Sequence, residues 1–219
     1  MSACSRCGAR VADWTRRRFE SAGLTQIPTG LYLKTMQRRL RGGTAMLLLD
    51  VSSSMHDSRS GTPALQEAVI GARRFVDEAV ETLYSIGIIL WNQDVADVRQ
   101  PTEDAHSAYE LLDGGSFPSG GTNLYPALCR AHKILGPLKG DRVVAIFGDG
   151  DLGVQAVQAL QKVAEMKAEN IRFITRGLGA AAAAAFSSIS DEEPEKTRVD
   201  SVEDLAEGIA SMASVLRKA

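Results

Sequence analysis

The sequence predicts an α/β fold with a doubly wound, mostly parallel central sheet and helices on both faces. Short apolar segments, such as residues 45–51 and 142–147, alternate along the chain with longer segments of helical periodicity. The apolar segments run almost without polar interruption, which is typical of parallel strands covered on both faces. Polar clusters follow several of these segments directly, and ligands of such folds bind at that edge of the sheet.

The elements of the first half follow from local signals. A helix is predicted over residues 63–82, with Thr62 as its N-cap and Pro63 at its first position. Apolar residues recur there every three to four positions, as an amphipathic helix requires. Strands are predicted over residues 84–91 and 94–100, the second of them at an edge of the sheet.

The second half continues the alternation of helices and strands. A short helix is predicted over residues 102–112, followed by a flexible loop rich in Gly, Ser and Pro over residues 113–122. The remaining predicted elements are helices over 124–135, 152–168 and from Ala180 onward, and strands over 142–147 and 171–175. The last helix begins at a capping box formed by Ser201 and Asp204. Its apolar face consists of Val202, Leu205, Ile209, Met212 and Leu216.

The composition excludes several classes of protein. With 219 residues, 44% of them hydrophobic and 24% charged, the chain can bury a sizeable core as a soluble globular protein. Aromatic residues make up only 5%, which argues against a stacking platform for single-stranded nucleic acid. No apolar run is long enough to cross a membrane, and no secretory signal is visible. We therefore expect a cytoplasmic protein.

The charge is distributed unevenly along the chain. Residues 1–41 carry nine Lys or Arg and two acids, a net charge of +7, although the whole chain has −2. This pattern predicts a basic N-terminal arm over residues 1–43 and an acidic domain over residues 44–219. The arm could pack on its own domain or contact an external anionic partner. Its arginine clusters are short, so specific recognition of nucleic acid is not expected.

The arm also contains two cysteines, in the sequence Cys4-x-x-Cys7-Gly. This is half of a zinc knuckle, and a structural zinc site needs four ligands. Two unligated thiols are therefore the simpler interpretation, with a zinc ion shared with another chain as the alternative.

One set of polar residues predicts a metal site. Asp50, Ser52 and Ser54 follow the first strand, and their spacing of two places them on one side of an extended turn. Thr122 follows a glycine pair at the start of a helix, and Asp149 ends a buried strand. Taken singly, each residue also suits a turn or a helix cap. Together they offer only hard oxygen donors, which Mg²⁺ or Mn²⁺ prefers.

These residues make the sequence resemble the von Willebrand factor type A domain, a Rossmann-like fold, over about residues 44–217. The family's metal-ion-dependent adhesion site has Asp-x-Ser-x-Ser after the first strand, a Thr in a later loop and an Asp after the fourth strand. Asp50, Ser52, Ser54, Thr122 and Asp149 occupy those positions. The chain departs from the family at Gly148, where a Thr is frequent.

The resemblance implies a function for each of these side chains. Ser52, Ser54 and Thr122 would bind the metal directly, while Asp50 and Asp149 would mostly hold metal-bound waters. An Asp or Glu carboxylate of a partner protein would take the remaining coordination position. The resemblance further implies a bacterial, non-enzymatic adaptor or assembly factor that works beside an ATPase or another multi-subunit assembly.

Two enzymatic functions remain as alternative predictions. Residues 177–182 match the dinucleotide-binding pattern Gly-x-Gly-x-x-Ala, with Asp200 about twenty residues downstream. Only one strand–helix unit remains after this motif, whereas a dinucleotide needs two mononucleotide-binding halves. A metal-assisted hydrolase is the second alternative because His56 lies near Ser54, but the sequence offers no evident general base.

Overall fold

The computed structural model of the chain describes residues 42–57 and 63–216. All of them belong to the compact unit formed by residues 41–219. Residues 1–41 of the predicted basic arm, with Cys4 and Cys7, lie outside the described residues, as does Thr62. None of the helices that the structure describes is long and apolar enough to cross a membrane.

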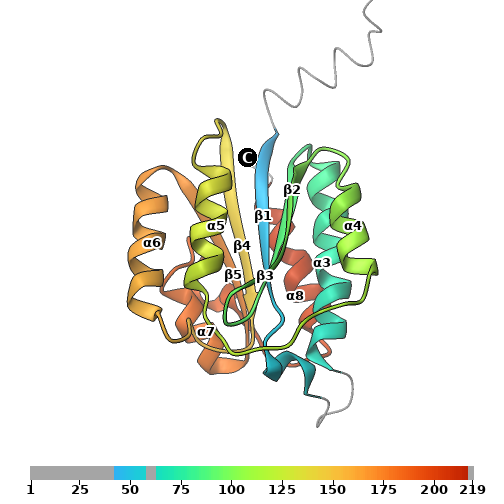
Figure 1. The fold of residues 1–219 in the computed structure, drawn as a ribbon, viewed down its shortest axis with the longest axis vertical. Helices are drawn as coiled ribbons and strands as arrows, with labels where there is room; N and C mark the ends of the chain where they lie inside the picture. The colour runs from blue at the N-terminus through green and yellow to red at the C-terminus, as the bar shows by residue number, and fades with distance from the viewer. Residues whose placement is uncertain (1–41, 58–62, 217–219) are drawn as a thin grey trace, which may run out of the picture. The chain divides into compact units, whose positions relative to one another are not determined.

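The described residues form one six-stranded sheet in the order β3-β2-β1-β4-β5-β6 (Figure 1). The strands are β1 Gly43–Asp50, β2 Ser85–Trp91, β3 Val95–Thr102, β4 Asp141–Gly148, β5 Ile171–Leu178 and β6 Arg198–Val199. Neighbouring strands are parallel except β2 and β3, which pair antiparallel. The predicted fold class is therefore confirmed, and β3 lies at an edge as expected.

Helices cover both faces of the sheet (Figure 1). Those on one face are α3 Ala64–Glu81, α4 His106–Asp113 and α8 Leu205–Ser211, and those on the other are α5 Tyr125–Leu135, α6 Ala156–Ala168 and α7 Gly179–Ser187. Short 3-10 helices complete the described part of the chain: η1 Ser53–His56, η2 Pro194–Thr197 and η3 Met212–Leu216.

The central strand β1 connects the two layers of the core. Leu47 and Leu49 pack against α3 and α8, while Met46 and Leu48 pack on the opposite face with α5 and α6, and all four are fully buried. Successive side chains of a strand point to opposite faces, so an uninterrupted apolar run suits a strand that is covered twice. Burial of each such side chain contributes about 1.5–3 kcal/mol.

Several element boundaries differ from the sequence prediction. The helix expected from residue 152 begins at Ala156, because Gly153 has a φ of +83° and pairs with Asn123 in an isolated β-bridge. The helix expected from residue 102 begins at His106, since β3 extends through Thr102. Pro63 caps α3 instead of occupying its first position.

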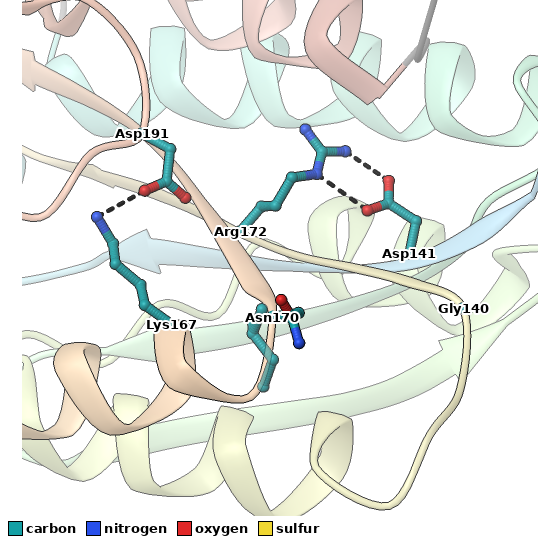
Figure 2. A pocket seen from close by; sticks show the side chains of 7 residues that line it. Gly140, Asp141, Lys167, Asn170, Arg172 and Asp191 are labelled. Atoms are coloured by element: carbon teal, nitrogen blue, oxygen red, sulfur yellow. Dashed lines mark hydrogen bonds and ion pairs between the residues drawn. The ribbon is translucent and has the colours of Figure 1, made fainter.

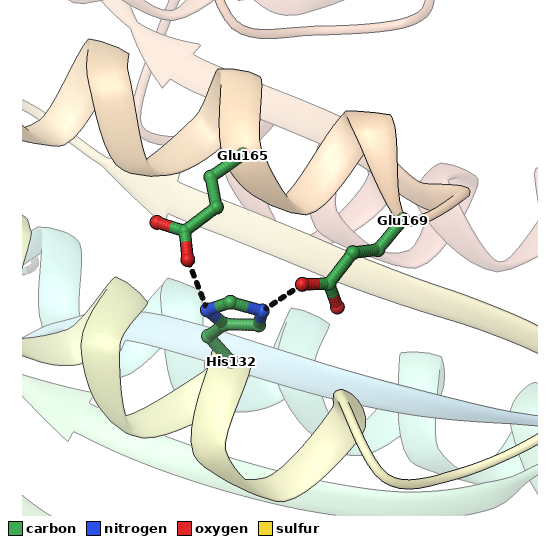
Figure 3. A group of neighbouring side chains, drawn as sticks. All are labelled: His132, Glu165 and Glu169. Carbon is green, nitrogen blue, oxygen red and sulfur yellow. Dashed lines mark ion pairs between the residues drawn. The ribbon is translucent and has the colours of Figure 1, made fainter.

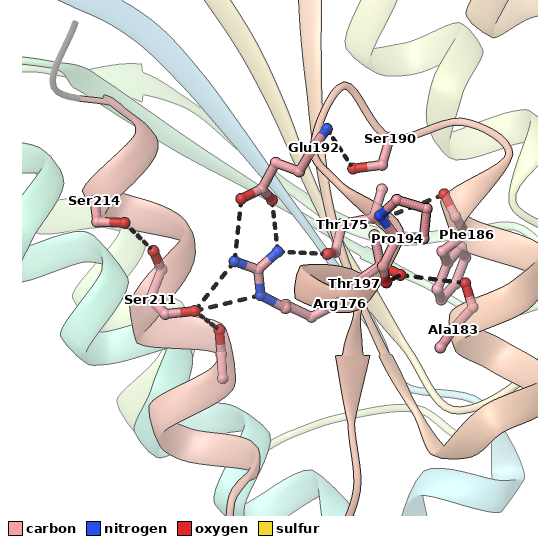
Figure 4. Close-up of polar contacts among 11 residues, drawn as sticks. Thr175, Arg176, Ala183, Phe186, Ser190, Glu192, Pro194, Thr197, Ser211 and Ser214 are labelled. Carbon is pink, nitrogen blue, oxygen red and sulfur yellow. Dashed lines mark hydrogen bonds and ion pairs between the residues drawn. The ribbon is translucent and has the colours of Figure 1, made fainter. Parts of the chain in front are cut away.

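A buried ion pair joins the end of β5 to the segment between α7 and η2 (Figure 4). Arg176 Nη1 lies 2.5 Å from Glu192 Oε2, and the two side chains are only 5% and 6% exposed. The same guanidinium donates to Ser211 Oγ of α8 and to the Thr175 carbonyl oxygen. A charge-assisted, bidentate pair of this kind fixes the geometry of the segments that it joins.

We expect Glu192→Gln to destabilise the domain by roughly 3 kcal/mol or more, because the Arg176 guanidinium would remain buried without its counter-charge. Chemical denaturation followed by circular dichroism measures the change. Asp200→Asn is the matched control, since the Arg198–Asp200 pair is mostly exposed and its loss should cost less than about 1 kcal/mol. Equal effects of the two substitutions would contradict the prediction.

Candidate metal centre

Four of the five predicted metal-site residues lie in one hydrogen-bonded cluster where β1 and β4 end. The Ser52 backbone N–H donates to Asp50 Oδ1 at 2.8 Å. The Ser52 and Ser54 hydroxyl oxygens lie 3.1 Å apart, and Ser54 Oγ donates to Asp149 Oδ1 at 2.8 Å. Because β1 and β4 are parallel neighbours, Asp50 and Asp149 meet at the same edge although they are far apart in sequence.

Asp50 is the buried carboxylate of this cluster. Its side chain is fully shielded from solvent, and among the described residues its Oδ2 atom has no hydrogen-bond partner. A buried polar atom without a partner costs free energy unless a ligand or water satisfies it. The exposed Ser54 lies at the rim of the same cluster, so the cluster extends from the buried Asp50 to the protein surface.

Gly148 leaves the space that this carboxylate occupies. A Cβ atom at position 148 would lie 2.9 Å from Asp50 Oδ2 and 3.0 Å from the ring of Phe186. The departure from the family pattern at this position therefore has a local cause, since Phe186 of α7 packs where a side chain at residue 148 would extend.

Thr122 lies beside the hydrogen-bonded cluster. A Cβ atom at Gly150, the residue after Asp149, would be 3.9 Å from Thr122 Oγ1. The loop that carries Thr122 is attached to η1, because the Ser53 N–H and hydroxyl both donate to the Gly120 carbonyl oxygen. Three segments that are distant in sequence thus bring all five predicted residues to one edge of the sheet.

Asn92, which was not among the residues predicted from the sequence, positions the same loop. Asn92 Nδ2 donates to the Pro118 carbonyl oxygen at 3.0 Å, and its own carbonyl oxygen accepts from the Asn123 N–H at 2.8 Å. Asn92 directly follows β2, so a polar residue just after a buried strand was the available signal.

The electrostatics of the cluster suit a cation. Burial, reinforced by the nearby Asp149 carboxylate and opposed by the Ser52 hydrogen bonds, raises the pKa of Asp50 from 3.8 to about 7. Burial also raises the pKa of Asp149. Two carboxylates whose ionised forms are disfavoured would both be stabilised by a nearby dication. All donor atoms of the cluster are hard oxygens, which Mg²⁺ and Mn²⁺ prefer as ligands. The buried, unpartnered oxygen of Asp50 is available to such an ion or to a water bound to it.

The dinucleotide-like motif has a packing function in the structure. A Cβ atom at Gly177 would lie 2.5 Å from the backbone of Ala182 and Ala183. The glycine therefore allows the backbone of α7 to approach β5 closely.

A cavity of about 440 Å³ lies at the opposite edge of the sheet, where β4 and β5 begin (Figure 2). Its charged side chains pair with one another, Arg172 with Asp141 and Lys167 with Asp191. Because these charges balance, the cavity favours neither an anion nor a cation.

A second charged group joins α5 to α6 (Figure 3). His132 Nε2 lies 3.0 Å from Glu169 Oε1, and its Nδ1 lies 3.7 Å from Glu165 Oε1. The two glutamates face different nitrogens of the ring, and Glu165 also pairs with Lys162. This arrangement suits an interhelical ion pair.

The raised pKa of Asp50 predicts a pH-dependent stability for the metal-free protein. The ionised carboxylate destabilises the fold, so this penalty grows as the pH rises from about 4 to about 7 and is complete above 7. We expect Asp50→Asn to raise the free energy of unfolding at pH 8 by on the order of 2 kcal/mol, and by little at pH 4. Denaturation in the presence of a chelator measures both values, and an Asn variant less stable than the parent at pH 8 would contradict the prediction.

Comparisons with known proteins agree with this architecture. Residues 45–151, which include all five predicted metal-site residues, match the family model of the von Willebrand factor type A domain. A comparison with curated proteins found no sequence match.

Similar solved structures include three proteins of low sequence identity. The vWF domain of the type V pili tip protein Mfa5 from Porphyromonas gingivalis is 11% identical, with a TM-score of 0.64 over 80% of this chain and 95% of that one. The pilus adhesin SpaC from Lactobacillus rhamnosus GG is 13% identical, with a TM-score of 0.66 over 80% and 30%. Proximal thread matrix protein 1 from the mussel byssus is 17% identical, with a TM-score of 0.61 over 78% and 46%.

At these sequence identities the structural similarity shows the fold alone. The chain spans less than half the length of the adhesin and of the mussel protein. The family match over residues 45–151 and the six-stranded, doubly wound sheet lead to one conclusion: this part of the chain is similar in sequence to the von Willebrand factor type A domain, and the described residues have a fold of that kind.

Proposed function

We propose that this domain is a module for divalent-cation-dependent protein–protein interaction. It binds Mg²⁺ or Mn²⁺ at Asp50, Ser52, Ser54, Thr122 and Asp149 and, through the metal, an acidic side chain of a partner. Domains of this family typically mediate adhesion or protein interaction, and they often bind divalent cations. The observation that carries the proposal is the buried Asp50 carboxylate with an unpartnered oxygen, at a cluster of hydroxyl and carboxylate oxygens.

The residues divide into two functions at this site. The hydroxyls of Ser52, Ser54 and Thr122 are the direct ligands, and the carboxylates of Asp50 and Asp149 orient metal-bound waters. When bound, the cation supplies a Lewis-acidic position for an external carboxylate. Its two positive charges balance the two aspartates, so an additional anion can approach without strong repulsion.

We propose a binding module rather than an enzyme. Ser54, the hydroxyl nearest in sequence to His56, donates its hydrogen bond to Asp149. His56 is exposed on η1 and reaches solvent, as expected of a residue beside the site. A cytoplasmic adaptor or assembly factor of bacterial origin, acting with an ATPase or another multi-subunit assembly, remains the corresponding proposal for the pathway.

Calorimetric titration of chelator-treated protein with Mn²⁺ and Mg²⁺ tests the metal site. We expect one saturable site per chain, abolished in Asp149→Ala because the second carboxylate of the cluster is lost. Asp151→Asn is the matched control, since this exposed neighbour lies outside the five-residue set. The titration is repeated with excess acetate, because the ion gains affinity when a carboxylate fills its open position. Absence of binding with and without acetate, or binding that survives Asp149→Ala, would overturn the proposal.

The hydroxyl of Thr122 provides an independent test. We expect Thr122→Ala to weaken Mn²⁺ binding by about tenfold or more and Thr122→Ser to retain it, because serine keeps the donor oxygen. Thermal denaturation with saturating Mn²⁺ measures the difference, since an ion at about one hundred times its Kd stabilises the fold by about 2.7 kcal/mol. Equal stabilisation of both variants would show that the hydroxyl is not a ligand.

A further inference from the structure

Apolar side chains are exposed on the segment that follows Asp149. Val154 is 87% exposed, Val157 65% and Leu160 41%. They follow one another at intervals of three residues, from the loop before α6 into its first turns, and we call these three side chains the α6 ridge. Five large apolar side chains are exposed in the described part of the chain, and three of them form this ridge. Exposed apolar residues that cluster indicate a surface that another molecule covers.

The ridge lies within an uncharged stretch of sequence. Residues 152–161 contain no Asp, Glu, Lys or Arg, although such residues make up 24% of the chain. Gln158 and Gln161 are the exposed polar residues between and beside the apolar ones. A solvated helix usually carries charges on its outer face, whereas the centre of a protein interface is depleted of them.

Backbone pairing attaches the ridge to the metal centre. Gly153, which precedes Val154, forms a β-bridge with Asn123, which follows Thr122. The Leu124 N–H also donates to the Leu152 carbonyl oxygen at 3.1 Å. A Cβ atom at Gly153 would lie only 2.2 Å from the Thr122 carbonyl oxygen, so the two loops approach as closely as glycine permits. The position of Val154 relative to the metal-site residues is therefore fixed.

We propose that the α6 ridge and the metal centre bind one partner segment together. An Asp or Glu of that segment occupies the open position of the metal, and an aliphatic or aromatic side chain near it in the segment packs on Val154 and Val157. This inference rests on the proposed function, because the carboxylate is recognised through the cation. The ridge supplies what the metal cannot, namely a preference for some acidic segments over others.

An acidic–apolar segment of another protein fits this surface better than a second copy of the same face. Residues 152–161 contain no carboxylate, so two ridges packed against each other would not fill either metal position from these residues. The carboxylates of Asp50 and Asp149 already balance the dication, which leaves its open position suited to one further carboxylate.

Two matched peptide libraries, one with a fixed Glu and one with a fixed Gln between randomised positions, test the inference on the full chain loaded with Mn²⁺, and preference for the Glu library measures selection of Glu. We expect the parent protein to select Leu, Ile, Val or Phe near the Glu. The double variant Val154→Asn/Val157→Gln should lose this selection and bind the best peptide about tenfold or more weakly, while still requiring Glu and Mn²⁺. Leu138→Gln is the matched control, because Leu138 is an exposed apolar residue between α5 and β4, at the opposite edge of the sheet.

The outcomes separate the inference from the proposed function. Selection of Glu in a Mn²⁺-dependent manner without any apolar preference would overturn the inference and leave the proposed function standing. Apolar selection that persists with chelator or in Asp50→Ala would show two independent surfaces and would also overturn it. A parent dimer that the double variant dissociates, observed by sedimentation, would assign the ridge to self-association instead. Failure of the parent to select Glu at all would contradict the proposed function itself.

Discussion

The burial of one carboxylate at the end of the central strand is the constraint on which the site depends. β1 is paired along its length with β2 and β4, and both of its faces are covered by helices. Asp50 is the last residue of this strand, so its side chain loses water because the strand is central. The Ser52 N–H satisfies one of its oxygens, and the other is left for a ligand.

This carboxylate costs the protein stability when it is ionised, and the proposed cation would offset that cost. A buried anion without a counter-charge destabilises the fold, and the burial of the large apolar core offsets this cost. The same burial holds the donor atoms in place before any ion arrives, which reduces the ordering that binding requires. Stability and the proposed metal binding therefore oppose each other at this residue, as is common at binding sites.

The loops around the site are held by hydrogen bonds to their backbone groups. Gly120 accepts two hydrogen bonds from Ser53, and Gly153 pairs with Asn123 beside Thr122. Close approach of this kind needs residues without a Cβ atom, which explains glycines in otherwise unrelated loops. Because Val154 follows Gly153 directly, the same contact that orders the metal site also presents an apolar side chain next to it.

The buried pair of Arg176 and Glu192 organises the other side of the same edge. It ties the end of β5 to the segment after α7 and, through Ser211, to α8. These segments contribute no residue to the five-residue cluster, yet they fix the end of the strand that neighbours β4. The edge that carries the site is thus supported on the β2 side by Asn92 and on the β5 side by the Arg176–Glu192 pair.

The sequence by itself determined the fold class and the identity of the clustered residues. Uninterrupted apolar segments such as that of β1 are required only where a strand is covered twice, and polar residues just after such strands meet at one edge. These signals are local, so Asp50, Ser52, Ser54, Thr122 and Asp149 could be named as a set before their geometry was known.

Only the tertiary structure decided how those residues are held and what surrounds them. The later start of α6, the contact of Gly153 with the Thr122 loop and the support from Asn92 all join segments that are distant in sequence. The space at Gly148 depends on Phe186 in the same way. Local propensity and periodicity contain no information about such partners, because each contact exists only once the strands have been brought side by side in the sheet.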